Sequence, residues 1–278
     1  MNYPIIDRVL VDLGFIVIPW YGVMYIAAFV VFYLLGRLRA GPDQLMQNGA
    51  MVSDLLFYGG FGVIVGGRLG YILLYAHEQF LNEPTILFRL WEGGMSFHGG
   101  LVGVLIASFV WARLRKIPYL PVMDFVAPLV PIGIGLGRIG NFINTELPGR
   151  VTEFALGVHF PCSAVRHYNL LCVTEWESVT RHISSLYQAF AEGVVLFVVM
   201  WVFSSRPRQI GMVSGMFLIC AGVIRIVTEF FREPDVGIGF ILFESITFGQ
   251  VLSVPVILGG IVLVLPLSRR RIGLAHNN

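Results

Sequence analysis

The chain has 278 residues, of which 56% are hydrophobic and only 13% are charged, and its formal net charge is +2. A soluble domain carries about 25% charged residues, so this composition excludes an ordinary soluble protein and indicates several membrane spans. The small net charge gives no sign of nucleic-acid binding. No small-residue cleavage site follows the first apolar run, so we expect that run to be retained as a span.

Seven apolar segments follow one another along the chain, each near the ~20 residues that a helix needs to cross a bilayer. They cover residues 13–36, 51–75, 97–113, 120–138, 184–203, 211–230 and 247–267. We therefore expect an all-α integral membrane protein, a single polytopic domain over residues 1–278 with seven transmembrane helices. The one long loop, residues 139–183, is expected to form a small cap on the outer face.

Basic residues indicate the orientation of these spans. Four alternating segments carry ten basic residues, whereas the longer segments on the other side carry six. The ten are Arg37, Arg39, Arg113, Arg115, Lys116, Arg206, Arg208, Arg269, Arg270 and Arg271. Because basic residues of short loops stay in the cytoplasm, we expect the N-terminus outside and the C-terminus inside. The outer loop contains Cys162 and Cys172, and whether they form a disulfide is left open.

Glycines cluster in two of the predicted spans. They are Gly59, Gly60, Gly62, Gly66, Gly67 and Gly70, followed by Gly133, Gly135, Gly137 and Gly140. Small residues four apart let membrane helices approach closely. We therefore expect these two helices to be packed against others, with Arg68 and Arg138 carried toward the protein interior.

Polar side chains gather where the fourth span ends. Arg138, Asn141, Asn144 and Glu146 follow directly on an apolar stretch. Such groups are costly in hydrocarbon and usually mark a site. His98 lies among four glycines at the outer end of the third span, where the backbone can approach a ligand closely.

Two further spans contribute polar groups at the same predicted depth. Arg225, Glu229 and Arg232 share one face of the sixth span, and Tyr21 lies near the outer end of the first. Together these groups suit an anionic head group near the outer surface. A phosphodiester fits best, because the arginine fork forms charge-assisted bidentate bonds with phosphate.

These motifs resemble one known family over nearly the whole chain. Residues 137–149, with the sequence GRIGNFINTELPG, resemble the signature of the bacterial phosphatidylglycerol–prolipoprotein diacylglyceryl transferases. Further matches are WYG at residues 20–22, GGMSFHGG at 93–100, Arg225 with EFFR at 229–232, and GQVLS at 249–253. Two positions depart from the family pattern: residues 182–188 are HISSLYQ in place of HPSQLYE, and Ala221 stands where a tyrosine is common.

The resemblance implies an enzyme of the bacterial cytoplasmic membrane without metal or organic cofactor. Its partners would be phosphatidylglycerol, membrane lipid and the lipobox segment of a prolipoprotein, whose cysteine thiol receives the diacylglyceryl group. His98 would be the base, and Arg138 and Arg225 would neutralise the phosphate. The substrate-binding residues would be Tyr21, Asn141, Asn144, Glu146, Gly149, Glu229 and Arg232. Glu146 and Glu229 are expected to position the arginines rather than to act as acids, with polarisation of a substrate hydroxyl by either one as the alternative.

Two other classes of function remain as alternatives. A transporter for an anionic solute also places arginines at glycine-broken helices, but it needs a site near the midplane, and we find no internal repeat. An intramembrane hydrolase would need a nucleophile–base pair, an aspartate dyad or a metal motif, none of which is evident in the sequence.

Overall fold

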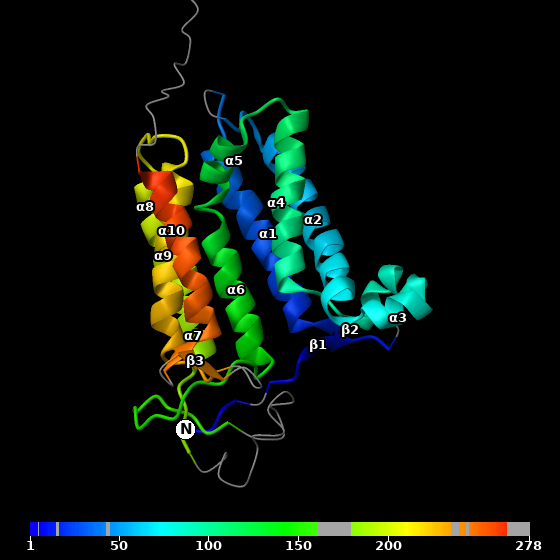
Figure 1. Cartoon of the computed structure of the whole chain (residues 1–278), viewed down its shortest axis with the longest axis vertical. Coiled ribbons are helices and arrows are strands. Elements are labelled where there is room, and N and C mark those ends of the chain that lie inside the picture. Colours follow the sequence, from blue (N-terminus) through cyan, green and yellow to red (C-terminus); the bar gives the residue numbers. More distant parts are fainter. Residues whose placement is uncertain are drawn as a thin grey trace, which may run out of the picture. The chain divides into compact units, whose positions relative to one another are not determined.

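The computed structural model describes residues 1–4, 6–14, 17–42, 45–160, 179–234, 239–242 and 245–265 (Figure 1). Cys162, Cys172 and Arg269 to Arg271 lie outside the described residues, so the disulfide question stays open. The chain divides into two compact units, one of Tyr33–Met123 and one of Met1–Phe32 with Asp124–Asn278. Each unit is described by itself.

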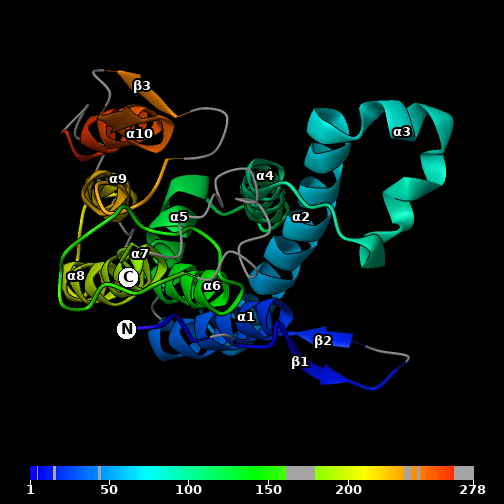
Figure 2. The ribbon, with the colours of Figure 1, turned by 90° about the horizontal axis from the view of Figure 1, so that it is seen from below.

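The unit Tyr33–Met123 is built on two helices, α2 (Gly49–Tyr75) and α4 (Phe97–Leu114), which lie side by side (Figures 1 and 2). Gly66 of α2 meets the backbone of Gly99 and Gly103, and Gly62 meets that of Gly103. A Cβ atom at Gly66 would lie 2.4 Å from the carbonyl oxygen of Gly99. The glycine spacing therefore correctly predicted a close helix crossing.

Short helices connect α2 to α4, and the Arg68 side chain donates hydrogen bonds to the backbone of this connecting segment. They are α3 (His77–Asn82) and the two 3-10 helices η1 (Pro84–Phe88) and η2 (Leu90–Glu92). The Arg68 side chain is buried and donates to the backbone carbonyls of Ile86, Arg89, Gly93 and Gly94. The interior placement of Arg68 is confirmed, and its charge is accounted for by these four carbonyls.

The other unit contains the remaining helices. They are the first part of α1 (Trp20–Arg39), the end of α5 (Tyr119–Val126), α6 (Val130–Ile143), α7 (Ser184–Gln188), the π-helix η5 (Ala189–Val195), α8 (Leu196–Phe203), α9 (Met212–Glu229) and α10 (Phe248–Val264). Figure 2 shows α9 between α10 and the continuous helix α7–η5–α8, with α6 beside that helix. Asp124 accepts hydrogen bonds from the backbone N–H groups of Gly211 and Ser214 and so caps the start of α9.

Two small antiparallel sheets complete the structure. One pairs β1 (Val9–Asp12) with β2 (Val17–Pro19), and the other pairs β3 (Phe240–Leu242) with β4 (Ile246–Thr247). The predicted start of the first span at residue 13 is therefore wrong, because Val17–Pro19 is extended and the helix begins at Trp20. Proline at position 19 favours the entry into the helix because it has no N–H to leave unpaired.

Within the described residues, five helical stretches are long and apolar enough to span a membrane: Trp20–Arg39, Gly49–Tyr75, Phe97–Leu114, Ser184–Phe203 and Met212–Glu229. The pair α5 and α6 makes a sixth if it is counted as one span bent by 53°. Pro128 lies at this break, where its missing N–H cannot continue a helix. The seventh predicted span corresponds to α10, which is shorter than the others at 17 residues. The structure therefore confirms a helical multi-span membrane protein with five or six candidate spans.

Candidate functional site

The arginine of the predicted signature lies on α6 and forms an ion pair with the π-helix η5. Gly135 of α6 packs on Gly193 of η5, with a built Cβ on either only 2.8 Å from the other's Cα. This close approach brings Arg138 Nε to within 2.8 Å of Glu192 Oε2. Since no side chain separates the two backbones here, the two glycines fix the geometry of the ion pair.

Glu192 is the site residue that sequence reasoning did not select. Its carboxylate also lies 3.5 Å from Nη1 of Arg225, so it joins arginines of two different helices. A π-helix adds a residue to the turn and often occurs at functional sites. The signal in the sequence that could have identified Glu192 is that it is an acidic residue in a predicted span that contains no basic residue to pair with it.

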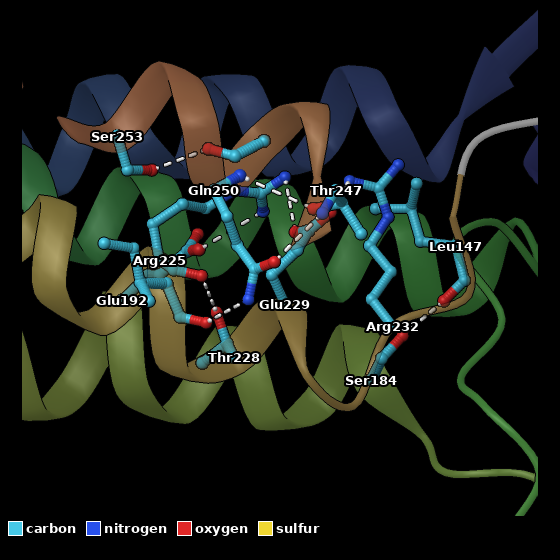
Figure 3. A network of polar contacts seen from close by, with 12 residues as sticks. Leu147, Ser184, Glu192, Arg225, Thr228, Glu229, Arg232, Thr247, Gln250 and Ser253 are labelled. Carbon is cyan, nitrogen blue, oxygen red and sulfur yellow. Dashed lines mark hydrogen bonds and ion pairs between the residues drawn. The ribbon is translucent and has the colours of Figure 1, made fainter. Parts of the chain in front are cut away.

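The predicted stripe on α9 forms a continuous network with Glu192 (Figure 3). Arg225 Nη2 lies 3.0 Å from Glu229 Oε2, and Arg232 Nη1 lies 3.5 Å from Glu229 Oε1. The spacing therefore correctly predicted a shared face. With Arg138 included, three guanidinium groups lie beside two carboxylates among the described residues.

The arginines of the network differ in exposure. The side chains of Arg138 and Arg225 are 22% and 23% exposed, whereas those of Arg232 and Glu229 are only 7% and 3% exposed. Arg138 donates from its Nε to Glu192. The more exposed arginine side chains are thus paired with buried carboxylates, and their guanidinium groups can form charge-assisted hydrogen bonds with an anion.

A second polar cluster lies at the end of α6. Asn141 Nδ2 donates to the Tyr21 hydroxyl at 2.9 Å and to Glu146 Oε2 at 2.7 Å, and Asn144 Nδ2 donates to Glu146 Oε1 at 3.2 Å. The chain turns back here through Thr145, whose φ of 57° is left-handed. Four of the predicted residues are thus brought together. Within the described residues, Glu146 contacts the two asparagines, and its expected role in positioning an arginine stays a prediction.

Gly149 is a tightly packed residue near Arg232, with hydrogen bonds from its backbone to two neighbouring residues. Its N–H donates to the His182 carbonyl at 3.1 Å, and its own carbonyl accepts from Arg181 Nη1 at 3.1 Å. A Cβ atom here would lie 2.2 Å from the His182 oxygen. These contacts explain the glycine through packing, and its predicted contact with substrate stays a prediction.

His98 belongs to the unit Tyr33–Met123. It is the second residue of α4, and the Ser96 hydroxyl caps this helix by accepting from the Gly99 N–H. The imidazole is exposed, and its ring lies edge-on to Phe97 at 5.7 Å between centroids. Gly93 and Gly94 precede it with φ of 81° and 78°, a backbone that favours glycine. The role of His98 as a base stays a prediction.

No group of three or more His, Cys, Asp or Glu side chains that could hold a metal ion occurs in the part of the chain that the structure describes.

Comparison with known proteins agrees with the motifs. The family model described as prolipoprotein diacylglyceryl transferase matches residues 8–266. A phosphatidylglycerol–prolipoprotein diacylglyceryl transferase of Xanthomonas euvesicatoria pv. vesicatoria is 49% identical over 95% of this chain and 92% of its own length. The enzyme of the same name from Chromohalobacter salexigens is 48% identical over 95% of this chain and 93% of its own. The chain therefore belongs to the prolipoprotein diacylglyceryl transferase family.

Proposed function

We propose that this protein transfers the diacylglyceryl group of phosphatidylglycerol to the lipobox cysteine of a prolipoprotein, forming a thioether and glycerol 1-phosphate. The names of its relatives support the two substrates. The observation that carries the proposal is the network of Arg138, Glu192, Arg225, Glu229 and Arg232, in which the side chains of Arg138 and Arg225 are partly exposed. Guanidinium groups form charge-assisted hydrogen bonds with a phosphodiester.

The proposed location is the bacterial cytoplasmic membrane, with seven spans, the N-terminus outside and the C-terminus in the cytoplasm. As the seventh span, α10 would extend about 26 Å at 1.5 Å per residue, close to the ~30 Å hydrocarbon core. The distribution of basic residues supports this orientation. Residues 139–183 would then form the outer cap, and membrane lipid would surround the spans.

In the proposed reaction, the arginines hold the phosphate while sulfur replaces it on carbon. The cysteine S–H gives its proton to His98, and the thiolate attacks the glyceryl carbon that bears the phosphate. The S–C bond forms as the C–O bond breaks, and the electron pair of that bond goes to the phosphate oxygen. Arg138 and Arg225 stabilise the charge that develops on this leaving group.

The second cluster is proposed to orient the head group. Tyr21, Asn141, Asn144 and Glu146 offer a hydroxyl, two amides and a carboxylate within hydrogen-bond distance of one another. Such groups suit the two hydroxyls of the terminal glycerol, which a phosphate site alone would not distinguish. Glu229 and Arg232 would support Arg225 from behind.

The transporter alternative is less well supported. Arg225 and Glu229 lie in the last two turns of α9, and Asn141 lies in the last turn of α6. A transporter binds its solute near the bilayer midplane and between repeats, whereas these groups lie at helix ends.

The direct test is glycerol phosphate release from phosphatidylglycerol vesicles by the purified full-length protein, with and without a lipobox peptide. We expect release only with the peptide, in equal amount to the lipidated peptide. Release without peptide would indicate a hydrolase instead. Vesicle uptake of glycerol phosphate without any product would indicate the transporter.

A further inference from the structure

Glu192 holds two arginines of the anion site with unequal contacts. It lies 2.8 Å from Nε of Arg138 but 3.5 Å from Nη1 of Arg225, and its side chain is only 7% exposed. Glu192 therefore lies between guanidinium groups from α6 and α9. The looser contact with Arg225 can be exchanged for a contact with a ligand oxygen.

We propose that the Glu192 carboxylate offsets part of the positive charge of Arg138 and Arg225 and so limits how tightly the doubly charged phosphate product is held. This inference rests on the proposed function and assigns to Glu192 the role of a positioning and charge-setting residue. It concerns product release rather than the bond-making step.

The charge balance gives the physical reason. Glu192 lies within ion-pair distance of Arg138 and Arg225, so its negative charge opposes the attraction of these arginines for an anion. When the C–O bond breaks, the product becomes a phosphate monoester with a charge of about −1.5 to −2 at pH 7. The Glu192 carboxylate therefore repels the product more strongly than it repels the diester substrate. Without the Glu192 charge, the site would retain the product more tightly.

The magnitude follows from Coulomb's law. The energy between a fixed charge and a bound anion is proportional to the charge of that anion and falls as the effective dielectric constant rises. Because the arginines are partly exposed, solvent reduces this effect, and we expect about a tenfold change for a dianion. The interaction scales with ligand charge, so a monoanion should change only about threefold.

The test is E192Q, which keeps the shape of the side chain but removes its charge. We would measure inhibition of lipid transfer by glycerol 1-phosphate and by its methyl diester, which is a monoanion. E192Q should be inhibited about tenfold more strongly by glycerol 1-phosphate and about threefold more strongly by the diester. A merely structural role predicts the opposite, since a loosened site binds both anions more weakly.

Two variants serve as controls. Glu153 is exposed in the same unit, so E153Q should leave both inhibition constants unchanged. E192D retains the charge and should retain the wild-type preference between the two anions. If E192Q loses its thermal transition, Glu192→Ala removes the same charge and carries the test.

The outcomes separate the two claims. If the wild type transfers lipid but neutral variants at residue 192 bind glycerol 1-phosphate no more tightly than the wild type, this inference is wrong and the proposed function stands. If the wild type neither transfers lipid nor releases glycerol phosphate, the proposed function itself fails.

Discussion

The crossing of α2 and α4 allows a sharp test of the packing argument with Gly66→Ala. The added Cβ would lie 2.4 Å from the Gly99 carbonyl oxygen and 2.7 Å from the Gly103 Cα. Both are backbone atoms, so no side-chain rotation can relieve the contact. The two helices would have to separate by about 1 Å to reach ordinary van der Waals distance.

A matched control exists on the same helix. Gly59 also lies inside α2, but nothing is within 4 Å of its built Cβ. Both substitutions gain the same helix propensity, about 1 kcal/mol, so this gain cancels when the two variants are compared. The remaining difference is the cost of overpacking, about 1–3 kcal/mol.

The assay is thermal unfolding of the purified variants in detergent. Gly66→Ala should melt about 2–12 °C below Gly59→Ala, taking roughly 2–4 °C for each kcal/mol in a protein of this size. We also expect it to transfer lipid more slowly, because α4 carries His98 at its start. Equal melting temperatures for the two variants would refute the close backbone contact between α2 and α4.

Further predictions concern the polar cluster and the close packing of Gly149 against His182. Tyr21→Phe removes the hydroxyl that accepts from Asn141, so we expect about a tenfold loss of transfer rate, a change of ~1.4 kcal/mol, with an unchanged melting temperature. A full transfer rate would show that this contact is dispensable. Gly149→Ala places a Cβ 2.2 Å from the His182 oxygen, so its melting temperature, measured by differential scanning fluorimetry, should fall below that of Gly59→Ala. Equal melting temperatures for the two variants would show that the contact between Gly149 and His182 tolerates the added methyl group.

Hydropathy was sufficient to locate the helices because each span must be apolar over its length. It could not locate the start of α1, since Val17 and Ile18 are as apolar in a β-hairpin as in a helix. It also missed the 53° bend between α5 and α6. Pro128 marks the position of that bend, but prolines are tolerated within membrane helices and do not by themselves predict a bend.

The site was partly accessible from spacing. Arg225 and Glu229 share a helix face by periodicity, and the structure pairs them at 3.0 Å. Glu192 could not be selected in this way because its partners, Arg138 and Arg225, lie on other helices. Its placement depends on the π-helix and on the contact of Gly135 with Gly193, which are tertiary features. The pairing of Glu146 with asparagines depends likewise on the left-handed turn at Thr145.

The most direct test of the central claim is the rate of lipid transfer to a lipobox peptide by Arg138→Ala, measured beside Arg206→Ala, an exposed arginine outside the network. His98→Ala and Arg225→Ala complete the set, and each variant should first show a normal thermal transition. The account predicts a loss of about 10²–10³ in rate for Arg138→Ala, as for removal of one oxyanion-stabilising donor, and no loss for Arg206→Ala. A near-full rate in a well-folded Arg138→Ala would contradict the role of the arginine network in holding the phosphate.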